Sequence, residues 1–208
     1  DEDVPAVEFL LTRAMYDGDP LFRIADGVPT LPRVPAVEHH VNQYLMVLAL
    51  ADVSPERELI AGNGEPYRVA DLIEAAKLGY EDGQEVGWTL VALTKYLPVE
   101  AKWTAANRQT YTIEDLLARG IERDPRDEAE GGTHHLFGVA YAFRAHERRH
   151  DALQGTWREA GAYLHEHVQI VKGFQQDDGA FSDGLLAESK SAESSAHRKP
   201  RVSTRARA

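Results

Sequence analysis

The stretch YRVADLI at residues 67–73 returns as YTIEDLL at residues 111–117, 44 positions further along the chain. Each copy follows a loop rich in Gly, Asn or Pro and opens an amphipathic pattern, which predicts helices over 69–80 and 112–123. Recurrence at such a spacing is typical of proteins built from repeated helical hairpins, with a period of about 45 residues here.

Three further helices are predicted over 37–52, 84–97 and 132–147, and their sequences are apolar nearly all round. A third amphipathic helix is predicted from Trp157 toward Phe174. A helix with one apolar stripe suits an outer layer, whereas a helix that is apolar on most sides suits a buried position. The pattern therefore predicts an all-α fold in which inner and outer helices alternate.

The N-terminal segment, residues 1–35, is predicted to contain a weak helix over 4–16 and then an irregular Pro- and Gly-rich stretch over 17–35. We expect no β-strands. The helical repeats are assigned to 36–186. Residues 187–208, rich in Ser, Ala and Arg, are predicted to form a disordered basic tail whose deletion leaves the thermal midpoint almost unchanged.

The sequence QQDDGAF at residues 175–181 is similar to a Gln-x-x-Asp-Gly-x-aromatic turn in squalene cyclases and prenyltransferase β subunits. In that α/α-toroid superfamily the turn leads from an outer helix into an inner one. Gly131-Gly-Thr-His134 also resembles a stretch in a bacterial branch of toroid-like proteins. The resemblance implies a partial α/α toroid over 36–182. Because a closed ring needs more hairpins than this chain holds, self-association to complete the toroid is one expectation.

The resemblance does not carry the chemistry of the superfamily with it. The Asp-x-Asp-Asp motif with which the cyclases protonate their substrate is absent. The chain has no cysteine, so it cannot reproduce the Asp, Cys and His zinc set of the protein prenyltransferases. A terpene cyclase-like, prenyltransferase-like or metal-dependent enzyme that uses other residues stays open as an alternative function.

Charge and hydropathy limit the partners. Of 34 acidic and 23 basic residues, two and six lie in the tail, which leaves 32 against 17 in residues 1–186. A body this acidic disfavours nucleic acid as a partner. No apolar run reaches the roughly 20 residues of a membrane span, and the hydrophobic fraction of 43% is ordinary for a soluble globular protein. Since the chain begins at Asp1, we expect a processed form or a fragment.

Two histidine pairs stand at the starts of two predicted inner helices, His39-His40 and His134-His135. A helical wheel, with about 100° per residue, turns one member of each pair toward the presumed concave face and the other toward a flank. The same phase places several polar and aromatic side chains on this face, and we expect a small-molecule or peptide ligand to bind there. The side chains placed there are His40, Gln43, Glu85, Trp88, Lys95, His134 and Tyr141.

Three functions remain open for these side chains. The face binds a ligand or partner without an assignable reaction, or it belongs to an enzyme in which His40 and His134 serve as acid, base or metal ligands. Alternatively, the histidines only complete helix ends within a structural array. Whichever holds, Leu93 and Val139 are predicted between inner and outer helices, and their truncation to alanine should cost about 1–4 kcal/mol.

His146-Glu147-Arg-Arg-His150 matches a zinc-peptidase pattern, with two histidines four positions apart and a glutamate as base. Glu166 is a conceivable third ligand. Neighbouring arginines repel a dication, so a solvated helix end is preferred over a peptidase. His165 and His167 diverge by about 200° on a helix and are predicted to be surface residues.

Overall fold

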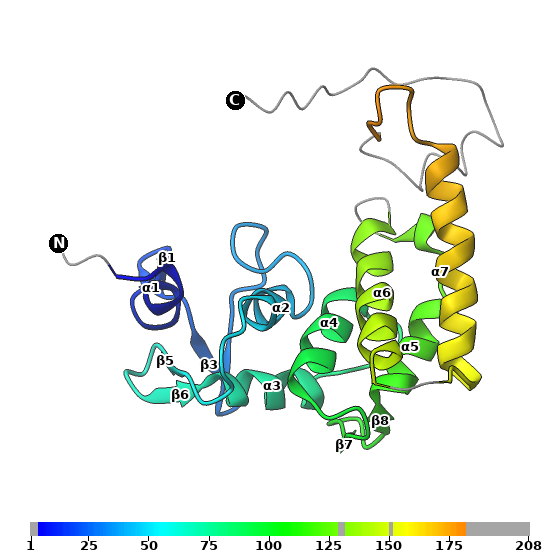
Figure 1. The fold of residues 1–208 in the computed structure, drawn as a ribbon. Coiled ribbons are helices and arrows are strands. Elements are labelled where there is room, and N and C mark those ends of the chain that lie inside the picture. The colour runs from blue at the N-terminus through cyan, green and yellow to red at the C-terminus, as the bar shows by residue number, and fades with distance from the viewer. Residues whose placement is uncertain (1–3, 129–131, 150–151, 182–208) are drawn as a thin grey trace.

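The computed structural model describes residues 4–128, 132–149 and 152–181 (Figure 1). Within these ranges the chain forms seven α-helices, one short 3-10 helix at Pro125–Asp127 and four two-stranded antiparallel sheets. The helices are α1 (Ala6–Thr12), α2 (Gln43–Leu50), α3 (Val69–Leu78), α4 (Gly87–Tyr96), α5 (Ile113–Ile121), α6 (Thr133–Glu147) and α7 (Gly155–Gly173). The strands are β1 (Met15–Tyr16), β2 (Asp19–Pro20), β3 (Arg23–Ala25), β4 (Val28–Thr30), β5 (Glu58–Ile60), β6 (Pro66–Arg68), β7 (Lys102–Thr104) and β8 (Thr110–Thr112).

The prediction of an all-α partial toroid without strands is wrong, because the fold is mixed. Strands β2, β3 and β4 lie in the stretch 17–35, where an irregular chain is predicted, and β1 lies at the end of the segment 4–16, where a helix is predicted. Their turns are Asp17-Gly18 and Asp26-Gly27, and all four residues have positive φ. Two-residue turns of this kind match the twist of a hairpin, and Asp-Gly is a preferred sequence for them. The strands have only two or three residues, too few for an alternating pattern to show.

The repeated stretches each close a hairpin and start a helix. Tyr67 pairs with Leu59 across β5 and β6, and Tyr111 pairs with Trp103 across β7 and β8. Each tyrosine hydroxyl accepts a hydrogen bond from an asparagine four residues earlier, at 3.3 Å in the first hairpin and 3.0 Å in the second. Asp115 then accepts from the backbone N–H of Thr112 and caps α5. The recurrence 44 residues apart is therefore a recurring hairpin and helix start.

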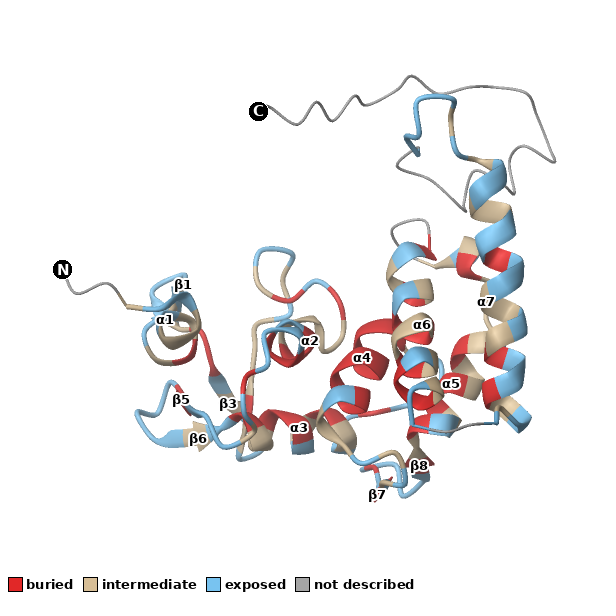
Figure 2. Cartoon of the chain, in the orientation of Figure 1, coloured by how far each residue is buried: buried red, intermediate tan, exposed pale blue. Residues whose placement is uncertain are grey.

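The helices after the first hairpins form two rows (Figure 1). We call α2, α4 and α6 the first row, in which α4 contacts both of the other helices. We call α3, α5 and α7 the second row. It packs on the first through the pairs α3–α4, α4–α5, α5–α6 and α6–α7. Helix α4 is thus surrounded, and every residue from Gly87 to Thr94 is buried (Figure 2).

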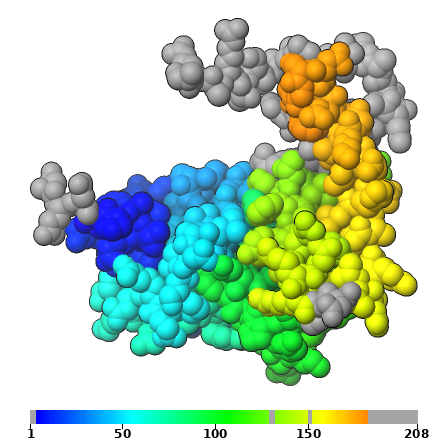
Figure 3. All heavy atoms as spheres, in the orientation of Figure 1, coloured from blue at the N-terminus to red at the C-terminus, as the bar shows by residue number. Residues whose placement is uncertain are grey.

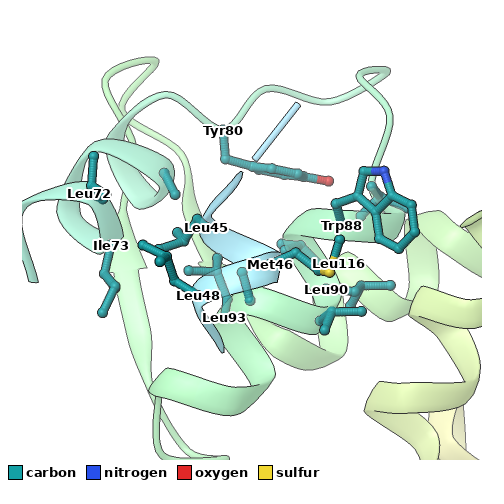
Figure 4. Close-up of a cluster of buried hydrophobic side chains, with 14 of the residues drawn as sticks. Leu45, Met46, Leu48, Leu72, Ile73, Tyr80, Trp88, Leu90, Leu93 and Leu116 are labelled. Atoms are coloured by element: carbon teal, nitrogen blue, oxygen red, sulfur yellow. The ribbon is translucent and has the colours of Figure 1, made fainter. Parts of the chain in front are cut away.

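Helix α4 lies at the centre of the core. Leucines and an isoleucine from α2, α3 and α5 form one buried cluster with α4, and Tyr80 belongs to the same cluster (Figure 4). Leu93 and Val139 are both fully buried, as predicted. The labelled members of this cluster in Figure 4 are Leu45, Met46, Leu48, Leu72, Ile73, Tyr80, Trp88, Leu90, Leu93 and Leu116.

Helix α7 packs on α5 and α6 through its first half, where Trp157 and Ala160 are buried. Beyond His167 the described residues are half-buried or exposed, and this part of the helix rises clear of the body (Figure 3). The Gln175–Phe181 stretch follows as a turn in which the Gly179 N–H donates to the Gln176 carbonyl at 2.8 Å. The predicted tail, 187–208, lies outside the described residues.

Among the described helices, none combines the length and the apolar character that crossing a membrane requires.

Candidate functional site

Three segments that precede or begin the first-row helices bring one residue each to a common place. His40 comes three residues before α2, Glu85 two residues before α4, and His134 is the second residue of α6. The ligand atoms of these three side chains all lie within 4.8 Å of one another. His40 is buried, and Glu85 and His134 are half-buried. We call this cluster the His-Glu-His triad.

A short hydrogen bond joins two members of the triad. His40 Nδ1 lies 2.8 Å from Glu85 Oε2, and because a carboxylate only accepts, the proton is on His40 Nδ1. The ring of His40 meets the ring of His134 edge-on, with centroids 4.8 Å apart. The segments that carry these residues lie 45 and 49 positions apart in sequence, so only the tertiary packing of α2, α4 and α6 brings them together.

Aromatic side chains form one wall of the triad. The Trp88 ring lies 4.4 Å from the His134 ring and 6.0 Å from the Phe137 ring, measured between centroids. Trp88 is buried, whereas Phe137 is exposed to 42%. Among the described residues, the Trp88 indole Nε1 has no hydrogen-bond partner although it is buried. The wall is therefore apolar on its surface and holds one unused donor.

Local hydrogen bonds position His40. The Gln43 side-chain oxygen accepts from the backbone N–H groups of His39 and His40, at 3.2 and 3.3 Å. Asn42 has a left-handed backbone, with φ of 59°, and its amide donates to the Thr89 hydroxyl on α4 at 2.9 Å. These bonds hold the turn that carries His40 against the first turn of α4.

The three side chains of the triad are of the types that bind metal ions. His134 lies in the first turn of α6, the longest first-row helix at 15 residues. A neutral imidazole presents a lone pair, and two such groups with one carboxylate form a common ligand set for divalent transition metals.

The structure gives the other predicted site residues different surroundings. Lys95 is exposed near the far end of α4, and its amine forms an ion pair with Asp52. The hydrogen bond from this amine to Asp52 raises the pKa of Lys95. Tyr141 is half-buried, and its ring centroid is 6.2 Å from that of Phe137. Neither Lys95 nor Tyr141 belongs to the triad.

The second member of each histidine pair differs sharply between the pairs. His39, which the wheel turns toward a flank, is exposed and stacks on the ring of His40, with centroids 4.7 Å apart. His135 is fully buried, and its Nε2 donates to the Gly120 carbonyl at 3.0 Å. Residues 37–42 are turns rather than helix, so a helical wheel does not describe the orientation of His39.

The zinc-peptidase pattern is only partly visible, because His150 lies outside the described residues. His146 is not a solvated helix end as predicted. It is buried and stacks on Trp157 with ring centroids 3.8 Å apart and planes at 5°. His165 is exposed, but His167 is buried, with Nδ1 2.8 Å from the Tyr163 carbonyl oxygen, so only one of the two is a surface residue.

Two shallow hollows lie away from the triad. One, of about 440 Å³, lies between α5 and α7 and is lined by Ile121, Glu122, Glu159 and Glu166 among others. The other, of about 480 Å³, lies beside His146 and Trp157. Neither is lined by a triad residue. Glu166, the conceivable third ligand of the peptidase pattern, lines the first hollow, whereas His146 lines the second.

Sequence reasoning missed three features near the triad. The role of Asn42 could not be predicted from the sequence, because its positive φ is a feature of the folded turn. Phe137 was placed on neither face by the wheel, although an exposed phenylalanine beside two histidines marks an open surface. The glycines Gly87 and Gly138 were visible in the sequence only as small residues.

No family model, curated protein or solved structure matches the chain. The resemblance to α/α-toroid proteins therefore stays a prediction that no comparison tests.

Proposed function

We propose that the chain binds one divalent transition-metal ion, of the zinc or iron(II) class, through His40, Glu85 and His134. The observation that carries the proposal is the meeting of their three ligand atoms within 4.8 Å, from segments far apart in sequence. Two imidazoles and one carboxylate suit these ions better than magnesium or calcium, which prefer oxygen ligands.

The distances in the triad are close to those of a loaded site. Two ligands at about 2.1 Å from one ion and at right angles to each other are about 3 Å apart. His40 Nδ1 and Glu85 Oε2 already lie 2.8 Å apart, so an ion can replace the proton between them. The ligand atom of His134 lies within 4.8 Å of both, near enough to complete the set of three.

Three protein ligands leave at least one position on the ion for water or a further ligand. This open position supports a binding or catalytic role and not a closed structural site. The Trp88 and Phe137 wall beside it offers an apolar surface to a small organic ligand.

Titration of metal-free protein with Zn²⁺ and Co²⁺ tests the proposal. We expect one ion per chain. Replacing a ligand, in the variants His40→Ala, Glu85→Gln or His134→Ala, should weaken binding by about 100-fold or more, since at most two of three ligands remain. The matched control is His39→Ala, which removes the exposed neighbour of His40 and should leave the affinity within about twofold.

Unchanged affinity in all three ligand variants would show that ions bind elsewhere. If wild-type protein binds no ion, the 2.8 Å bond between His40 and Glu85 favours a second function. The carboxylate then orients His40 as a general base or acid without a metal.

A further inference from the structure

Helices α4 and α6 touch backbone to backbone directly beside the triad. A Cβ atom added to Gly138 would lie 2.3 Å from the Gly87 carbonyl oxygen and 2.6 Å from the Gly87 Cα. A Cβ atom added to Gly87 would lie 2.7 Å from the His134 carbonyl oxygen. No side chain separates the two helices at this point, and only glycine fits at either position.

The two glycines are linked to the two ligands by short, rigid paths. Gly138 is four residues after His134, so the two lie on the same side of α6, one turn apart. Gly87 is two residues after Glu85 and begins α4. The His134 backbone also rests on Gly87 itself, as the 2.7 Å approach shows. The separation of Glu85 from His134 is therefore set where the two helices touch.

We infer that Gly87 and Gly138 are positioning residues for the metal site, which fix the distance between Glu85 and His134. The inference rests on the proposed function of the triad. An ordinary carbon contact starts near 3.4 Å, so a methyl group at Gly138 forces the helices apart by about 1 Å. Binding sites tolerate misplacement of about 0.5 Å, so this displacement moves His134 out of reach of an ion held by His40 and Glu85.

The test measures Zn²⁺ affinity and the coordination of bound Co²⁺ in wild-type protein, Gly138→Ala and Gly87→Ala. We expect each variant to bind Zn²⁺ about 100-fold more weakly, as His134→Ala does, because the same ligand is lost. The number of histidine ligands on bound Co²⁺, measured by X-ray absorption at the cobalt edge, should fall from two to one. Loss of stability alone would not change the number of histidines on the ion, so this readout separates positioning from folding.

The matched control is Gly161→Ala, in which the new Cβ atom lies 3.1 Å from the Phe143 ring in the α6–α7 contact. This variant crowds α6 from the side of α7, at a place that touches no triad residue. The Zn²⁺ affinity should therefore stay within about twofold of wild type.

The possible results distinguish a failure of the proposed function from a failure of this inference. If wild-type protein binds no ion, the proposed function fails. If wild-type protein binds an ion and both glycine variants bind it equally well with two histidine ligands, the triad stands and this inference is overturned. If both variants lose their helical circular dichroism even with saturating Zn²⁺, the inference is also overturned, because the contact then serves the whole fold.

Discussion

Leu93→Ala is expected to lower the free energy of unfolding by about 2–5 kcal/mol, the range for removing a buried leucine. Leu93 is fully buried in α4, which packs against helices of both rows. The surrounding side chains are therefore held in place and cannot fill the cavity that the leucine side chain leaves. Val139→Ala removes fewer atoms from an equally buried position on α6 and should cost less, about 1–3 kcal/mol. Urea unfolding followed by circular dichroism measures both.

The control for these truncations is Leu78→Ala at the end of α3, where the leucine side chain is exposed to 45%. It should change the free energy of unfolding by no more than about 0.5 kcal/mol. If Leu93→Ala falls in the same range as Leu78→Ala, α4 does not occupy the centre of the core.

Acidification is expected to destabilise the metal-free protein between about pH 6.5 and pH 4 through His135. Burial, together with the nearby charges of Arg123 and His167, lowers the pKa of His135 to about 4, against the opposing effect of its hydrogen bond to the Gly120 carbonyl. The unfolded chain has the higher pKa and binds the proton first. The contribution of neutral His135 is therefore complete above pH 6.5 and is lost as the pH falls toward 4, by about 3 kcal/mol in all.

His135→Gln tests this expectation, because its amide still donates to the Gly120 carbonyl but does not titrate. In the presence of a chelator, the variant should lose less free energy of unfolding than wild-type protein between pH 6.5 and 4, by about 2–3 kcal/mol. His39→Gln, at the exposed member of the other pair, should keep the wild-type dependence. Parallel pH curves for wild-type protein and His135→Gln would contradict the assignment.

The helices were predictable because their apolar residues recur over ten or more positions. The segments 69–80, 84–97, 112–123 and 132–147 each contain an observed helix, and the limits differ by a few residues. The hairpins were not predicted, because two or three residues cannot show a period. Asp17-Gly18 and Asp26-Gly27 are the available signal, but in a Pro- and Gly-rich stretch the same dipeptides also indicate an irregular chain.

For the triad, the residues could be predicted from the local sequence, but their arrangement depends on tertiary contacts. His40 and His134 stood out as histidines before apolar runs, and Glu85 followed from the repeat spacing. Their separation could not be predicted, since it depends on Gly138 lying against Gly87, a contact between segments about 50 residues apart. Likewise, His146 reads as part of a peptidase motif until Trp157 of the next helix stacks on it.

The central claim is that His40, Glu85 and His134 hold one metal ion. Anomalous diffraction at the zinc edge, from crystals grown with one equivalent of Zn²⁺, tests it most directly. The account predicts a single strong peak bonded at about 2.0–2.2 Å to one nitrogen of each histidine and to a carboxylate oxygen of Glu85. A peak at any other histidine with none between His40, Glu85 and His134 would contradict it.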